Sequence, residues 1–188
     1  MTRLLSASAA IDRLTATIGR YAAWGVLAAC VVAAANAIPR KLFGLGSNAW
    51  LETQWLLFSA VFLLAAPWTL AANEHIRIDI LTGRLSKRRR AWLDLAGHVL
   101  FLMPVAAVVV WTSLPFALTS LAQNEGSSNF GGLPQWPLKL LIPIAFGLLL
   151  LQAVSQIIKT VAVLSGPVSA SPGPASPVGS SPDGKPRS

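Results

Sequence analysis

The residues that could carry out chemistry in this sequence are few and widely spaced. There is one cysteine, Cys30, and two histidines, His75 and His98. A thiol or quinone oxidoreductase needs paired cysteines, and a haem protein needs axial histidines that face each other across a bundle. His75 and His98 leave a haem pair geometrically open, but a hydrogen-bond donor is the simpler interpretation of His98. We therefore expect no cofactor and no bound metal.

Short catalytic motifs are also missing from the chain. It contains no Gly-x-Ser-x-Gly, no His-Glu-x-x-His and no glycine-rich phosphate-binding loop. With no catalytic, cofactor-binding or metal-binding residues to name, the sequence predicts a protein that is not an enzyme. The alternative is a role in binding or scaffolding, in which side chains hold other groups in place. This alternative depends on the structural elements that carry those side chains.

The composition indicates that these elements lie in lipid. Of the 188 residues, 54% are hydrophobic and only 12% are charged, whereas a soluble domain has about 25% charged residues. Charges are absent from four stretches, at 21–39, 53–73, 95–124 and 140–158. About 20 apolar residues suffice for one helical crossing. The sequence therefore predicts an all-α integral membrane protein with four transmembrane helices, at about 21–39, 53–73, 95–118 and 140–160.

The basic residues predict the orientation of these spans. Twelve of the fifteen Lys and Arg residues precede the first span, lie between the second and third, or follow the fourth. Arg40, Lys41 and Lys139 are the three on the opposite side. By the positive-inside rule, both termini and the middle loop are cytoplasmic. The net charge of +8 is therefore interpreted as a topology signal.

The two ends of the chain differ from the membrane domain at 21–164. In the N-terminal segment at 1–20, Leu4, Ile11, Leu14 and Ile18 share one helical face, which favours a cytoplasmic amphipathic helix on the membrane surface; a frayed terminus is the alternative. The segment at 165–188 is rich in Pro, Ser and Gly. Because it can bury little apolar surface, we expect a disordered cytoplasmic tail.

Polar groups in the spans predict helix packing and no ion pathway. Charged residues such as Glu52 and Glu74 stand at span ends, whereas a self-sufficient ion-coupled transporter usually buries ionisable groups. Gln152, Ser155 and Gln156 share the fourth span, and amide or hydroxyl side chains in lipid tend to hydrogen-bond between helices. The chain thus resembles a partner of a transporter more than a complete one.

Two loops carry further information. The cytoplasmic loop at 73–90 combines Glu74, Arg77 and Asp79 with a basic cluster suited to anionic membrane lipids. Its acidic residues suit an ion pair within the chain or with a partner protein. The external loop at 124–139 contains Gly131, Gly132 and Pro134, which favour a shaped turn. Trp136 follows them and is placed to anchor that turn.

Together these loops resemble a known family. The string Asn73-Glu74-His75-Ile76-Arg77-Ile78-Asp79, followed by a basic cluster and Ala91-Trp92-Leu93-Asp94-Leu95, is similar to the central signature of the DctQ-like small membrane subunit of tripartite ATP-independent periplasmic (TRAP) transporters. Segments 47–55, 125–139 and 142–152 agree with it, and the resemblance covers about residues 20–160. The external loop most resembles the branch labelled mannitol/chloroaromatic compound or 2-oxo acid transport.

This resemblance implies a division of labour. The chain would be a multi-pass protein of the bacterial inner membrane that supports a large permease, which carries the substrate and sodium sites, while a periplasmic solute-binding protein delivers an organic acid or related solute. Candidate contacts with the large subunit or lipid are Glu52, Trp55, Glu74, Arg77 and Asp79. Gly131, Gly132, Pro134 and Trp136 would shape the external loop. A free-standing membrane scaffold or sensor, or a haem- or quinone-linked subunit, are the alternatives, and no nucleic acid is expected as a partner.

Overall fold

The computed structural model of the chain describes residues 2–44, 46–72 and 86–165. The elements in these ranges are helical: α1 (Thr2–Phe43), α2 (Asn48–Ala72), α4 (Lys87–Ala96), the π-helical turn η1 (Gly97–Leu102), α5 (Met103–Ala122) and α6 (Trp136–Ser165). Helices suit lipid because they satisfy every backbone hydrogen bond within one segment. Four helical runs within these residues are long and apolar enough to cross a membrane: Arg3–Phe43, Asn48–Ala72, Arg88–Ala122 and Trp136–Ser165. The expected all-α fold with four spans is confirmed.

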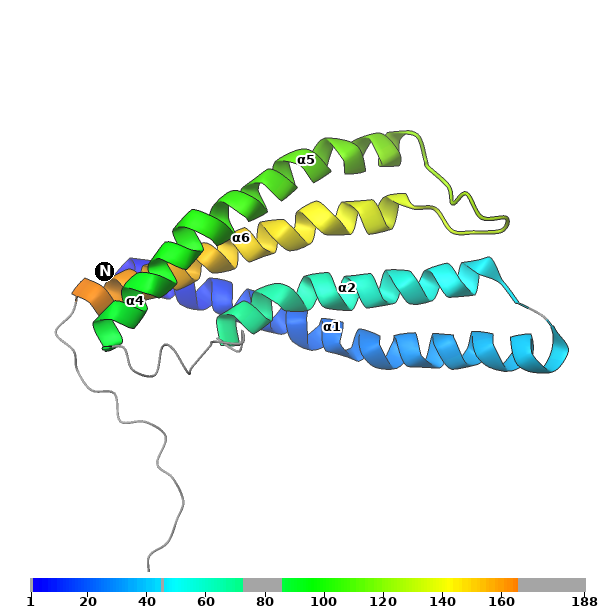
Figure 1. Ribbon diagram of the computed structural model, residues 1–188, viewed down its shortest axis with the longest axis horizontal. Coiled ribbons are helices and arrows are strands. Elements are labelled where there is room, and N and C mark those ends of the chain that lie inside the picture. The colour runs from blue at the N-terminus through cyan, green and yellow to red at the C-terminus, as the bar shows by residue number, and fades with distance from the viewer. Residues whose placement is uncertain (1, 45, 73–85, 166–188) are drawn as a thin grey trace, which may run out of the picture.

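The helices are arranged around α6. It packs against α5 on one side and against both α2 and α1 on the other, while α1 and α2 pack closely together. Figure 1 shows that α5 diverges from α1 and α2, and that the α1–α2 connection and the α5–α6 loop lie at the same end of the molecule. We call this the loop end. The opposite end, where α1 begins and α6 finishes, is the terminal end.

Close packing of α1 on α2 depends on two glycines. A methyl group added at Gly19 would lie 2.6 Å from the Cβ atom of Trp68, and one added at Gly25 would lie 2.7 Å from a Val61 methyl. Small residues let membrane helices approach closely and gain dispersion contacts. The two contacts also fix which levels of α1 and α2 lie side by side.

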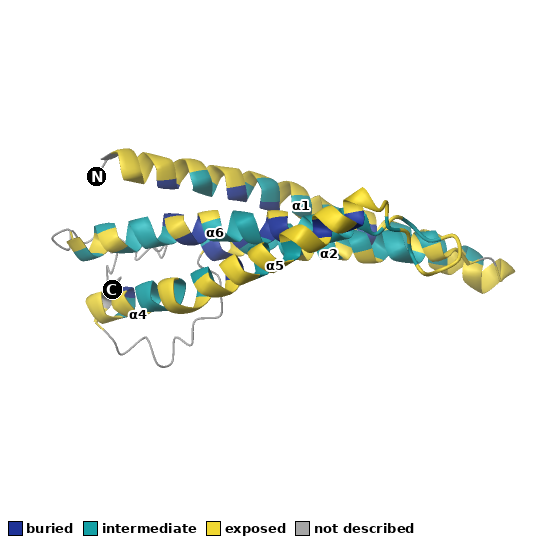
Figure 2. Ribbon diagram, turned by 90° about the horizontal axis from the view of Figure 1, so that it is seen from above, coloured by how far each residue is buried: buried dark blue, intermediate teal, exposed yellow. Residues whose placement is uncertain are grey.

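Helix α1 is longer than one crossing requires. Its 42 residues extend about 63 Å at 1.5 Å per residue, compared with a hydrocarbon core of about 30 Å. The N-terminal segment at 1–20 was expected to form a separate surface helix, but from Thr2 onward it is continuous with the first predicted span. Figure 2 shows the buried residues of this part of α1 on the side that faces α6.

The third span contains a π-helical turn, which Pro104 explains. Proline has no N–H to donate, and its ring clashes with the carbonyl of the residue four positions earlier. In η1 the N–H of Met103 instead donates to the carbonyl of His98, five residues back. This wider turn joins α4 to α5, and the helix continues through Pro115 to Ala122.

Candidate functional site

The loop end contains a polar cluster centred on Glu52, near the start of α2. Its carboxylate accepts hydrogen bonds from the Ser127 hydroxyl, from Asn129 Nδ2 at 2.8 Å and from the backbone N–H of Leu133 at 2.7 Å. All three donors belong to the loop between α5 and α6. We call Glu52, Ser127, Asn129 and Leu133 the loop-end cluster, because one carboxylate holds this loop against α2.

Backbone hydrogen bonds give the same loop its shape. The N–H of Ser127 donates to the carbonyl of Leu133 at 3.1 Å, and the N–H of Gln135 donates to the carbonyl of Glu125 at 2.8 Å. A second contact with α2 comes from Asn48, whose Nδ2 donates to the Phe130 carbonyl at 3.1 Å. The Phe130 side chain is 98% exposed. The loop is therefore ordered by α2 and presents an aromatic ring outward.

The glycines that were expected to shape this loop have specific roles in it. Gly131 has φ of +69°, a conformation that costs little only for glycine. At Gly132 an added methyl would lie 2.5 Å from the Ser127 Cβ atom and 2.8 Å from Glu52 Oε1. The loop can therefore approach the Glu52 carboxylate this closely only because residue 132 has no side chain. Pro134 pairs with Gly126 in an isolated bridge.

Two aromatic candidates lie beside this loop. Trp136 begins α6, directly after the loop. Trp55, one turn after Glu52, is 57% exposed, and with Glu52, Asn129 and Leu138 it lines a small cavity of about 80 Å³ between α2 and the loop. Trp55 therefore retains surface for a partner, whereas the Glu52 carboxylate is occupied by the chain's own loop.

An ion pair fixes the base of the loop. Lys139 of α6 binds the Glu125 carboxylate, and the same ammonium lies 4.2 Å from the centroid of the Phe116 ring on α5. The hydrogen bond from the Lys139 ammonium holds the pKa of the Glu125 carboxyl below its ordinary value. Glu125 therefore remains charged at neutral pH, and Lys139 joins the loop to both α5 and α6.

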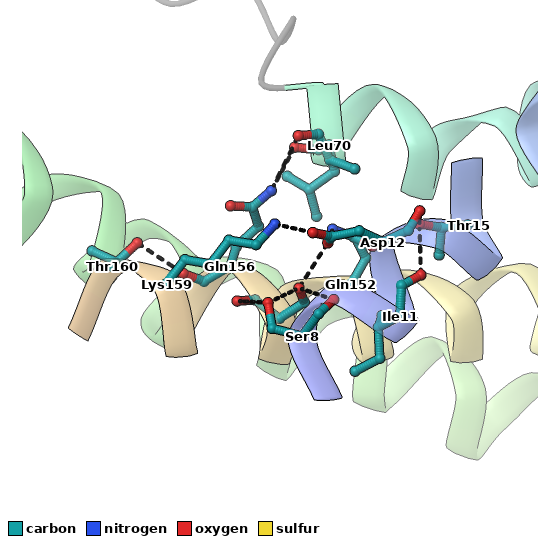
Figure 3. A network of polar contacts seen from close by, with 11 residues as sticks. Ser8, Ile11, Asp12, Thr15, Leu70, Gln152, Gln156, Lys159 and Thr160 are labelled. Atoms are coloured by element: carbon teal, nitrogen blue, oxygen red, sulfur yellow. Dashed lines mark hydrogen bonds and ion pairs between the residues drawn. The ribbon is translucent and has the colours of Figure 1, made fainter. Parts of the chain in front are cut away.

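The terminal end contains a second polar cluster, between α1 and α6 (Figure 3). Its centre is Asp12, which pairs with Lys159 and accepts hydrogen bonds from Ser155 Oγ at 2.8 Å and from Gln152 Nε2 at 2.9 Å. Gln152 Oε1 in turn accepts a hydrogen bond from Thr15 at 2.7 Å, and the hydroxyls of Ser8 and Ser155 are 2.7 Å apart. We call Ser8, Asp12, Thr15, Gln152, Ser155 and Lys159 the terminal-end cluster.

Gln156 extends this arrangement to α2. Its Nε2 donates to the carbonyls of Leu70 at 3.2 Å and Ala71 at 3.4 Å. These carbonyls belong to the last turn of α2 as described, Asn48–Ala72, and the last carbonyls of a helix commonly lack an intrahelical donor. The side chains of α6 thus bind both α1 and α2, in agreement with the packing role expected for Gln152, Ser155 and Gln156.

Sequence reasoning missed the part that Asp12 plays, although a signal was present. Ser8, Asp12 and Thr15 recur at intervals of four and three residues, as do Gln152, Ser155 and Lys159, so each set lies on one helical face. Assigning residues 1–20 to the membrane surface separated Asp12 from the fourth span. The acidic partner of Lys159 was therefore not identified.

The described residues offer little for metal or redox chemistry. They contain no group of three or more His, Cys, Asp and Glu side chains that could hold a metal ion. Cys30 is exposed, and His98 Nδ1 lies 2.5 Å from the carbonyl of Asp94 within its own helix. His75, like the predicted contacts Glu74, Arg77 and Asp79, lies outside the described residues.

The architecture is that of a multi-pass helical membrane protein whose polar side chains mainly join its own elements. The family model of the DctQ component of tripartite ATP-independent periplasmic transporters matches residues 29–163, which is most of the chain. The chain therefore belongs to this family and is a small membrane subunit of a TRAP transporter. Such systems also comprise a large permease and a solute-binding protein. Searches among curated proteins and solved structures gave no match.

Proposed function

We propose that this subunit braces the large permease of a sodium-coupled TRAP system that takes up an organic acid across the bacterial inner membrane. Both termini would be cytoplasmic, and the loop end would face the periplasm, as the distribution of basic residues indicates. Glu74, Arg77 and Asp79 would contact the large permease or anionic lipid headgroups on the cytoplasmic side. Trp55 would offer a further contact at the loop end.

The main observation behind this proposal is that the Asp12 carboxylate between α1 and α6 is already bound by side chains of the same subunit. A sodium site needs carboxylate or carbonyl oxygens free to coordinate the ion. The Asp12 carboxylate instead binds Lys159, Ser155 and Gln152. Moreover, the cavity of about 480 Å³ between α5 and α6 is lined by apolar side chains such as Val110, Leu114 and Leu150. Substrate and ion would therefore bind in another subunit.

Uptake by reconstituted components tests this function. The three components, namely this subunit, the large permease and the solute-binding protein, are combined in vesicles with an imposed sodium gradient and a panel of radiolabelled organic acids. We expect uptake of one class of acid that requires sodium and all three components. Uptake of equal rate without this subunit would contradict a bracing role. Uptake that is unchanged when potassium replaces sodium would contradict the coupling ion.

A further inference from the structure

One face of α1 carries a regular stripe of exposed residues that turns away from the other helices. The stripe consists of Arg13, Thr17, Arg20, Trp24, Leu27 and Val31, all exposed. Successive members are four or three residues apart, a mean spacing of 3.6. This is the repeat of the α-helix itself, so the stripe runs straight along one face of α1. The stripe therefore forms one continuous surface along which a neighbouring helix can pack.

The rest of α1 shows that this surface is not used within the chain. The residues of α1 that contact α6 and α2, among them Ser8, Thr15 and Gly19, are buried on a different face. On the stripe, Trp24 is 69% exposed and Leu27 is 58% exposed. Helix α1 therefore packs against α2 and α6 with one face, whereas the stripe on the opposite face remains exposed.

The distance between Arg20 and Glu52 along the helix axes is too short for both residues to lie outside a bilayer. Gly25 of α1 is level with Val61 of α2, because their side-chain positions touch. Arg20 is five residues from Gly25, and Glu52 is nine residues from Val61 on the other side of this level. The distance along the helix axes is therefore about 21 Å, which is shorter than the hydrocarbon core of about 30 Å.

Apolar residues on both sides of Arg20 place it within the lipid-facing belt. Toward the terminal end, Leu14 of α1 is 47% exposed, and it lies about 30 Å from the level of Glu52, still within the thickness of the hydrocarbon core. Such a side chain is suited to lipid and lies beyond the level of Arg20. Glu52 at the other boundary is hydrogen-bonded to the external loop. Arg20 is thus an outward-facing charged residue of α1 inside the apolar belt.

An arginine in this position needs a partner. Ionisable residues inside membrane segments almost always face other protein groups or a water-filled cavity, because facing lipid is costly. Within the described residues, Arg20 makes no hydrogen bond or ion pair, and its side chain is exposed on the stripe. A partner for Arg20 must carry an acceptor for a guanidinium, and a carboxylate meets that need best.

We propose that the α1 stripe is the surface on which a transmembrane helix of the large permease packs, and that this helix presents a carboxylate at the level of Arg20. The apolar members Trp24, Leu27 and Val31 supply the packing seam, and Arg20 fixes its register and partner choice. This inference rests on the proposed function, because it takes the large permease as the partner.

Charge reversal on the stripe is the first test. Arg20→Glu is co-expressed with the large permease, and the amount of permease that co-purifies with the tagged small subunit in mild detergent is measured. We expect a loss of about 30-fold or more, as for removal of one partner of a desolvated ion pair, whereas Arg20→Lys retains most of the complex. Arg3→Glu, at an exposed arginine of α1 that is not part of the stripe, is the matched control and should bind like the wild type.

Cross-linking gives a second test that does not depend on the folding of a charge variant. A photo-reactive amino acid is placed at Leu27 on the stripe or at Trp111 on α5, which is 82% exposed. Irradiation of membranes that contain the complex should link the Leu27 variant to the large permease. The Trp111 variant should give little or no such product.

Three results separate the possible failures. If Arg20→Glu co-purifies like the wild type and Leu27 does not cross-link to the permease, the stripe is not the interface. If the Leu27 variant cross-links to phospholipid alone, and Arg20→Glu lowers binding to anionic vesicles, the guanidinium binds a headgroup phosphate and our assignment is wrong. If the wild-type subunit does not co-purify with the permease at all, the proposed function itself fails.

Discussion

The two polar clusters of this subunit each contain one carboxylate with three partners, yet they join different kinds of structure. Glu52 at the loop end binds two side chains and one backbone N–H, all from a single loop. Asp12 at the terminal end binds three side chains from α6, one of which is the cation of Lys159. One carboxylate therefore shapes a loop, and the other fixes two helices relative to each other.

This difference follows from the environment of each carboxylate. Glu52 lies at a span end, where polar loop groups can reach it, so it needs no cation among the described residues. Asp12 lies between two helices, where every nearby backbone group is already used within a helix and only side chains remain as donors. A carboxylate between membrane helices therefore calls for a cation, whereas a carboxylate under a loop can be satisfied by neutral donors.

The largest expected effect is on the terminal-end cluster. Replacing Asp12 by Leu leaves the ammonium of Lys159 without its partner and removes the acceptor for Gln152 and Ser155. Because the ion pair is about one-third exposed, we expect the free energy of unfolding to fall by about 2–3 kcal/mol, less than for a fully buried pair. Unfolding in detergent micelles with increasing denaturant measures this change.

The double variant Asp12→Leu with Lys159→Leu serves as the control. It removes both charges and fills the contact with apolar groups, so it should recover most of the lost stability. Equal stability of the wild type and of Asp12→Leu would show that the cluster does not hold α1 on α6.

At the loop end the expected effect is smaller and local. Glu52→Gln keeps the size of the side chain but removes its charge and one acceptor oxygen. The loop should lose local stability because the Leu133 amide keeps a weaker acceptor, seen as faster hydrogen exchange of that amide. Glu125→Gln, which changes the pair with Lys139 instead, should leave the Leu133 amide closer to the wild type. Unchanged exchange in Glu52→Gln would mean that the backbone bonds alone hold the loop.

The smallest expected effect comes from one methyl group in the same loop. Gly132→Ala places its Cβ atom against Ser127 and Glu52, which should push the loop from α2 at a cost of about 1 kcal/mol. Gly126→Ala has nothing within 4 Å and is the matched control. Limited proteolysis after Phe130 should accelerate in the first variant only. Equal cleavage of the two variants would contradict the close approach of loop and carboxylate.

Much of the fold was predictable, but the pairing of its polar groups was only partly so. The four charge-free stretches gave the spans, and the spacing of Gln152, Ser155 and Gln156 on one helix indicated their packing role. Gly131 and Gly132 indicated a shaped loop. However, the residues that lie opposite these groups depend on how far each helix continues, and the continuation of α1 back to Thr2 was not expected.

By itself, the sequence determined that this protein is a four-span helical membrane subunit, because the hydrocarbon core demands long apolar segments and tolerates few charges. Its loop motifs also indicated the family. Only the tertiary structure decided that Asp12 meets Lys159, 147 residues away, and that Glu52 meets the external loop. Such contacts depend on the relative levels of the packed helices, which the glycine contacts of α1 with α2 help to fix.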